Sequence, residues 1–145
     1  MRRRYGLGFK PGMRATDDER YLTSLNFVGK TVYDIGGYVG IYTLFFAHAA
    51  GPDGHVVAFE PNPQNYRELQ LNVQLNKFTN VTAIQSAIGA HCGNIALHVD
   101  PLAPARGFIA GARDDLPLKK RARVPVELWS LDNMIAQRGL TPPDL

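Results

Sequence analysis

Two acidic residues and a group of glycines are the part of this sequence best suited to chemistry. Asp34 lies at the end of an apolar run and is followed within six residues by three glycines, and Glu60 ends a second apolar run 20 residues beyond Gly40. A strand that ends in an acid and turns through glycines presents backbone N–H groups and a carboxylate to one crevice. Such a crevice suits a ligand that carries both a positive charge and a ribose, because a carboxylate accepts hydrogen bonds from ribose hydroxyls.

The glycine spacing argues against a nicotinamide dinucleotide site. That site requires further glycines two and five residues after the first one. Larger side chains occupy these positions here: Tyr38 and Ile41 counted from Gly36, Val39 and Tyr42 counted from Gly37. Asp34 would also repel a pyrophosphate, whereas it would favour an ammonium group. The sequence therefore favours a cationic nucleoside over a dinucleotide.

The elements that must position these residues alternate between strand and helix. Residues 1–27 predict an N-terminal arm ending in a short helix at 17–25, and residues 28–145 predict one domain. The domain begins with strands at 30–35, 56–59 and 81–85, separated by helices at 41–50 and from Pro63 onward, with Asn62 as the cap of the second helix. This order is typical of a right-handed βαβαβ unit, and we predict a doubly wound, mostly parallel α/β sheet.

Side-chain patterns add more detailed predictions. In the helix after Pro63, Tyr66, Leu69 and Val73 are expected to face the core, with Asn72 pointing away from it. Alternation predicts a half-exposed strand at 95–99, an extended loop at 100–122, and a strand at 124–128 that Pro125 would force to a sheet edge. A short helix is expected between Ser130 and Gly139, followed by the entry to another strand at 141–145.

Composition limits the class of protein. The chain has 145 residues, 45% hydrophobic and 20% charged, with a net charge of +3, which is too small an excess to indicate a nucleic-acid partner. Two basic clusters, at 2–4 and 119–123, lack interleaved aromatic residues and are interpreted as solvated surface. No segment is long enough to span a bilayer, the single Cys92 and the scattered histidines indicate no metal site, and the cytoplasm is the expected location.

Several ordered motifs resemble the FkbM-type family of methyltransferases. They are residues 34–43 (Asp-Ile-Gly-Gly-Tyr-Val-Gly-Ile-Tyr-Thr), residues 59–63 (Phe-Glu-Pro-Asn-Pro), the helix end at 72–76 and the pair Leu131-Asp132. The similarity covers residues 28–145. It implies a Rossmann-like class I methyltransferase fold that binds S-adenosylmethionine and usually methylates hydroxyl oxygens of sugars or secondary metabolites.

The resemblance also implies which residues contact the cofactor. Asp34 would face its amino acid end, and Glu60 would hold its ribose. The other expected contacts are Gly36, Gly37, Tyr38 and Gly40 in the turn, Pro61 and Asn62 beside the ribose, and Ser86 and Ala87 near the adenine. Tyr38 departs from the family pattern, which usually has a small or amide residue there, often Asn, so its ring must turn away from the cofactor or act as a lid. The sequence assigns no catalytic base.

The family pattern also continues beyond Leu145 into a strand that ends in acidic residues. We therefore expect residues 28–145 to be the N-terminal, incomplete part of a C-terminally truncated fold, with the first strand left at an exposed apolar edge. Two hypotheses follow. The first is an O-methyltransferase, or its cofactor-binding half, acting on a small-molecule acceptor. The second is a catalytically inactive cofactor-binding remnant that needs a partner chain.

Overall fold

The computed structural model describes residues 16–99, 108–109 and 122–145. The predicted N-terminal arm, nearly all of the predicted loop at 100–122 and most of the two basic clusters lie outside these ranges. Within the described ranges, none of the helices combines the length and the apolar character needed to cross a bilayer.

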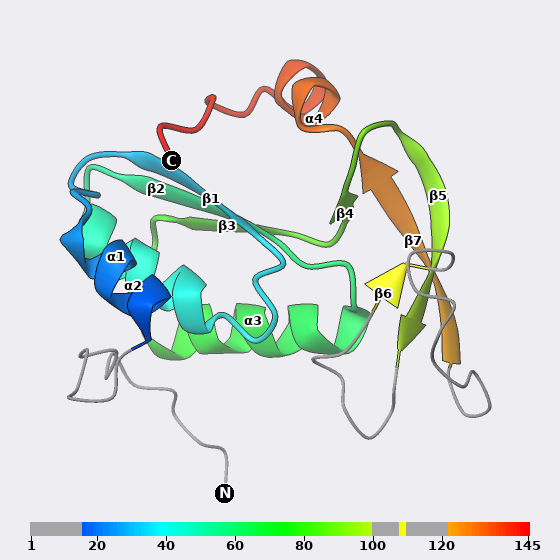
Figure 1. Cartoon of the computed structure of the whole chain (residues 1–145), viewed down its shortest axis with the longest axis horizontal. Coiled ribbons are helices and arrows are strands. Elements are labelled where there is room, and N and C mark those ends of the chain that lie inside the picture. Colours follow the sequence, from blue (N-terminus) through cyan, green and yellow to red (C-terminus); the bar gives the residue numbers. More distant parts are fainter. Residues whose placement is uncertain (1–15, 100–107, 110–121) are drawn as a thin grey trace, which may run out of the picture.

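A parallel three-stranded sheet carries the first half of the chain. Its strands are β1 (Thr31–Ile35), β2 (His55–Phe59) and β3 (Val81–Ile84), in the order β1-β2-β3. The connections are α2 (Ile41–Ala50) and α3 (Pro63–Leu75). In Figure 1, α1 (Asp17–Ser24), α2 and α3 lie on one face of this sheet and α4 (Leu131–Arg138) on the other. The predicted doubly wound α/β architecture is therefore confirmed.

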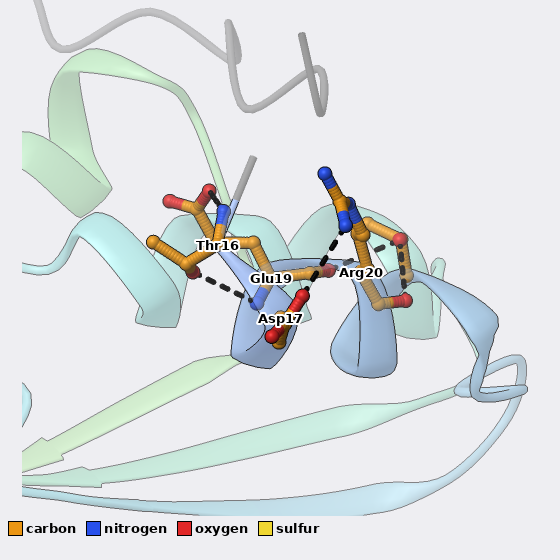
Figure 2. A network of polar contacts seen from close by, with 5 residues as sticks. Thr16, Asp17, Glu19 and Arg20 are labelled. Carbon is orange, nitrogen blue, oxygen red and sulfur yellow. Dashed lines mark hydrogen bonds and ion pairs between the residues drawn. The ribbon is translucent and has the colours of Figure 1, made fainter. Parts of the chain in front are cut away.

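Local capping chemistry explains where the helices begin and end. The Asn62 side chain accepts a hydrogen bond from the Gln64 N–H, and Pro63 occupies the first turn of α3. Ser130 caps α4, which ends at Gly139 in a left-handed conformation. At α1, Thr16 and Glu19 each accept the other's backbone N–H, at 3.2 and 2.9 Å respectively (Figure 2). The predicted starts of all three helices are confirmed, although the capping box of Thr16 and Glu19 is not among the predicted signals.

A second sheet follows, and it corrects one prediction. Its strands are β4 (Ala87–Ile88), β5 (Gly93–Val99), β6 (Phe108–Ile109) and β7 (Ala122–Trp129), in the order β4-β7-β5-β6. The prediction that Pro125 places its strand at a sheet edge is wrong, because β7 lies between β4 and β5. Proline is tolerated there because β4 pairs only with Leu128 and Trp129, so the side of Pro125 that faces away from β5 has no strand beside it in the described part of the chain. The predicted loop at 100–122 also contains β6.

Two apolar clusters hold the helices against the parallel sheet. On the α2 side, Val32 and Val56 pack with Phe27 and Phe46. On the opposite side, Met134 of α4 is fully buried against Val57 and Phe59. Because side chains of a strand alternate between its faces, the α2 face of the sheet also receives Asp34 and Glu60.

The last residues run beside β1, on the edge away from β2. The Leu145 carbonyl accepts the Tyr33 N–H at 2.9 Å, and the Thr31 carbonyl accepts the Asp144 N–H at 2.8 Å. These two bonds run in the sense of a parallel strand pair, but residues 140–145 form no strand, so the strand expected from 141 stays a prediction. β1 is an edge strand of the parallel sheet, and Ile35 at its end is 54% exposed.

Candidate functional site

The two acids meet at the carboxyl end of the parallel sheet. β1 and β2 run in register with Asp34 opposite Ala58, and Glu60 follows β2 directly. The charge of Asp34 contributes to a raised pKa of Glu60, as expected for two carboxylates close together. The carboxyl ends of parallel strands are where ligands bind in open α/β sheets.

The turn between β1 and α2 folds back over the end of β2. The backbone N–H groups of Gly36 and Gly37 both donate to the Phe59 carbonyl, at 2.8 and 3.0 Å. Gly36 and Gly40 have φ angles of 89° and 92°, in the left-handed region that glycine adopts without strain. Tyr38, with a φ of 52°, adopts that region without being glycine. The predicted glycine turn is therefore a tightly wound loop attached to the second strand.

Asp34 lies beneath this loop and is partly buried. Its Oδ2 accepts a hydrogen bond of 2.5 Å from the hydroxyl of Thr43, a residue of α2 that is fully buried. Burial raises the pKa of Asp34, and the Thr43 hydrogen bond opposes that increase. Sequence reasoning missed Thr43, although its place three residues into the helix after the last glycine of the turn is a usable signal.

Glu60 is 6% exposed as a residue, and its carboxylate is held at both oxygens. Oε2 accepts the Tyr38 N–H at 2.9 Å, and Oε1 accepts the Asn62 N–H at 2.8 Å and the Asn65 side-chain amide at 3.4 Å. Burial raises the pKa of Glu60, these three hydrogen bonds lower it, and the charge of Asp34 raises it further; the net direction is upward. The carboxylate is thus fixed in orientation before any ligand arrives.

One face of α3 supports the glycine loop, and it corrects a second prediction. Asn65, Leu69 and Asn72 are buried at helical spacing. The Asn72 side-chain amide donates to the Val39 carbonyl at 2.8 Å, so the prediction that Asn72 points away from the core is wrong. The reason is that the loop offers a buried carbonyl that needs a donor. Asn65 and Asn72 lie four residues before and three residues after Leu69, so helical spacing alone could have placed them on the same buried face of α3.

Two of the predicted cofactor contacts carry buried polar atoms without a hydrogen-bond partner among the described residues. They are Nδ2 of Asn62, just after β2, and Oγ of Ser86, just after β3. Asn62 and Ser86 are 3% and 1% exposed. Buried polar atoms of this kind are rare in proteins and often indicate a missing polar partner. A nucleobase, which carries both donors and acceptors around a planar ring, has the chemistry to satisfy them.

The remaining predicted contacts are placed less directly. Pro61 is partly exposed between Glu60 and Asn62. Ala87 is buried with its side chain in the apolar cluster of β5 and β7, which leaves its main chain as the part able to meet a ligand. Within the described ranges, His, Cys, Asp and Glu side chains form no group of three that could hold a metal ion.

A comparison with protein families agrees with this geometry. A family model described as the methyltransferase FkbM domain matches residues 34–145. The chain belongs to the FkbM methyltransferase family. The resemblance predicted from the motifs is confirmed, and the family is one of S-adenosylmethionine-dependent methyltransferases.

Individual relatives of this FkbM methyltransferase chain are distant. "Methyltransferase 1" of Beauveria bassiana (strain ARSEF 2860) is 32% identical over 78 residues, which are 54% of this chain and 31% of that protein. The crystal structure of methyltransferase FkbM from Methylobacillus flagellatus KT has a TM-score of 0.50 at 14% identity, covering 77% of this chain and 24% of that one. A SAM-dependent methyltransferase from Aquifex aeolicus has a TM-score of 0.44 at 25% identity, over 48% of this chain and 38% of that one. The chain therefore spans about a third of the length of its curated relative, and the likeness to the Methylobacillus structure shows the fold alone.

For an FkbM methyltransferase, the residues present fit an adenosyl cofactor. Two acids at the same sheet end have the charge and the acceptor atoms that a cation and a ribose require, and two unsatisfied polar atoms lie just after the neighbouring strands β2 and β3. Sequence reasoning brought these residues together, and it missed Thr43, Asn65 and Asn72, which hold the loop and the carboxylates in place.

Proposed function

We propose that this chain binds S-adenosylmethionine at the carboxyl ends of β1, β2 and β3 and forms the cofactor-binding part, residues 28–145, of a methyltransferase. The observation that carries the proposal is the Glu60 carboxylate, which is buried and oriented by two backbone N–H groups. A carboxylate has about four lone-pair sites on its two oxygens, so it can accept further hydrogen bonds from the two ribose hydroxyls.

The other predicted residues complete the proposed site. Ser86 would offer its unpaired hydroxyl to the adenine ring, and Asn62, expected beside the ribose, would offer its unpaired amide to the same nucleoside. Asp34, supported by Thr43, would favour the ammonium end of the cofactor through its charge. The exposed backbone at Gly36 would permit close approach, because a Cβ built there meets no atom within 4 Å.

The proposed acceptor is a hydroxyl oxygen of a sugar or a secondary metabolite. When bound, the cofactor supplies an electrophilic methyl group on a sulfonium. The task of the chain's own residues is then to orient the nucleoside and keep water out, since alignment of the reacting groups lowers the barrier of such a displacement. Radiolabelled methyl transfer to panels of sugars, hydroxylated metabolites and amines tests the acceptor class, and transfer only to amines would contradict the hydroxyl proposal.

Calorimetric titration with S-adenosylhomocysteine tests the cofactor site. The wild-type chain should bind, and Glu60→Ala should weaken binding by about 1 to 3 kcal/mol, the loss expected for hydrogen bonds to a buried charged group. Glu68→Ala, an exposed glutamate on α3, serves as the matched control and should bind as the wild type does. Equal affinity of the Glu60→Ala and wild-type chains would contradict the proposed site.

A second candidate function is a catalytically inactive cofactor-binding remnant that depends on a partner chain. The apolar end of the edge strand β1 favours it, because Ile35 is 54% exposed there. Binding of S-adenosylhomocysteine without methyl transfer to any acceptor, together with association through this edge, would favour the remnant over the enzyme.

A further inference from the structure

Tyr38 is held in a backbone conformation that tyrosine rarely adopts. Its φ angle of 52° lies in the left-handed region, where the Cβ of an L-residue approaches the following carbonyl oxygen. Only two residues other than glycine show a positive φ in the described part of the chain, and the second is Lys77, in the turn after α3. Such a conformation persists only when surrounding contacts stabilise it.

Two side chains supply those contacts. Glu60 Oε2 accepts the Tyr38 N–H at 2.9 Å, and the Asn72 amide donates to the carbonyl of the next residue, Val39, at 2.8 Å. The turn is therefore fixed from the β2 side and from the α3 side. The hydrogen bond between the Tyr38 N–H and Glu60 serves both groups: the carboxylate stabilises the turn, and the N–H fixes the orientation of the carboxylate.

Two loops each supply one backbone N–H to the Glu60 carboxylate, and the Asn65 side-chain amide adds a longer contact at Oε1. Tyr38 holds Oε2 from the glycine loop, and Asn62 holds Oε1 from the start of α3. Among the described residues Tyr38 alone donates to Oε2, so removing its N–H would let the carboxylate rotate about the contacts on Oε1, and its free lone pairs would no longer point in one fixed direction. A ligand with two adjacent hydroxyls is sensitive to that direction, because both hydrogen bonds require a defined carboxylate plane.

We propose that Tyr38 is a positioning residue: its main-chain N–H, presented by the left-handed backbone, orients Glu60 toward two vicinal hydroxyls of the bound nucleoside. This inference rests on the proposed function for the identity of the ligand. The identity of the side chain at position 38 then tunes ligand affinity without touching the ligand, through the cost of keeping the backbone left-handed.

A substitution series at position 38 separates this role from a merely structural one. Asparagine tolerates the left-handed region better than tyrosine does, and valine tolerates it worse because of its branched Cβ. Tyr38→Asn should keep or increase the affinity for S-adenosylhomocysteine, whereas Tyr38→Val should reduce it about tenfold, the loss expected when a hydrogen bond to a charged group is disturbed. Lys77→Val is the matched control, because it imposes the same backbone cost at an exposed turn that makes no contact with Glu60.

The decisive measurement compares two ligands by calorimetry: S-adenosylhomocysteine and its 2′-deoxy analogue. Tyr38→Val should lose about tenfold for the first ligand and less than about threefold for the second, because the second lacks one of the hydroxyls that Glu60 must meet. Lys77→Val should leave both affinities unchanged. Equal losses for the two ligands, or wild-type affinity of Tyr38→Val, would overturn the inference.

A ligand-free measurement keeps the inference distinct from the proposed function. The groups that face Glu60 are the carboxylate of Asp34, the side-chain amide of Asn65 and the backbone N–H groups of Tyr38 and Asn62. The two backbone amide proton shifts should follow pH with one common transition in NMR spectra, and this transition should be absent in Glu60→Gln. A Tyr38 amide that does not follow it would overturn the positioning contact. A shared transition in a chain that binds no S-adenosylhomocysteine would instead overturn the proposed function, and the role of the contact in ligand binding with it.

Discussion

Replacing Gly37 by alanine tests how closely the glycine loop is packed. A Cβ at this position would lie 2.8 Å from Leu69 Cδ1, 3.2 Å from Thr43 Oγ1 and 3.4 Å from Asp34 Oδ2. The first distance is shorter than real carbon contacts, and Leu69 is fully buried, so its side chain has little room to move. The φ angle of Gly37 is not in the left-handed region, so steric overlap is the only cost of the substitution.

Overpacking of this kind lowers the free energy of unfolding by about 1 to 3 kcal/mol. For a domain of this size, the melting temperature should fall by roughly 3 to 12 °C. Gly93→Ala is the matched control, because its Cβ would meet nothing within 4 Å and its φ is not left-handed. The control should remain within about 0.5 kcal/mol of the wild type in urea-induced unfolding.

A second substitution identifies the source of the cost. Leu69→Val removes the Cδ1 atom that the new methyl group would meet, so the double variant with Gly37→Ala should lose about 1 kcal/mol less than the sum of the single variants. Strict additivity, or a Gly37→Ala chain as stable as the wild type, would refute the close packing of the loop on α3.

Three further predictions concern the groups that support the site. Asn72→Ala should lower the free energy of unfolding by about 1 to 3 kcal/mol in urea, because the Val39 carbonyl loses its donor; an alanine substitution at an exposed position of α3 should cost far less. Burial raises the pKa values of Asp34 and Glu60 above their ordinary 3.8 and 4.5, so the folded chain binds more protons than the unfolded one. Their contribution to stability should therefore be largest below those values and decrease as pH rises through the folded pKa values, and an unchanged slope in Asp34→Asn would contradict this. Thr43→Val should raise the pKa of Asp34 further in an NMR titration, because the hydroxyl that lowers it is removed.

The parts of the fold that local chemistry determines could be predicted from the sequence. The start of α3 follows from a cap and a proline, Asn62 and Pro63, and α4 is bounded by Ser130 and Gly139. The acids at the ends of β1 and β2 could be brought together because right-handed βαβ units place consecutive parallel strands side by side. Each of these inferences needs only a few neighbouring residues and a general rule of connection.

Contacts between distant segments could not be predicted in this way. The position of β7 inside its sheet depends on β4, a strand of two residues that carries no periodic signal. The burial of Asn72 depends on a carbonyl 33 residues earlier, which only the folded loop presents to α3. Asn72 is favourable in its buried position because the distant Val39 carbonyl accepts its amide, and Pro125 is tolerated inside its sheet because the short β4 does not reach it.

The polar residues buried around the loop explain why binding and stability should be linked in this protein. A glycine turn that approaches a ligand leaves main-chain N–H and carbonyl groups without partners of their own, and these groups require buried acceptors and donors. Glu60 provides an acceptor and Asn72 a donor. Because Glu60 belongs to the proposed ribose site and Asn72 belongs only to the scaffold, their substitutions should separate. Loss of Asn72 should destabilise the chain and weaken binding in proportion to loop disorder, whereas Glu60→Gln, which keeps the shape but offers one acceptor oxygen instead of two, should weaken binding out of proportion to its effect on stability.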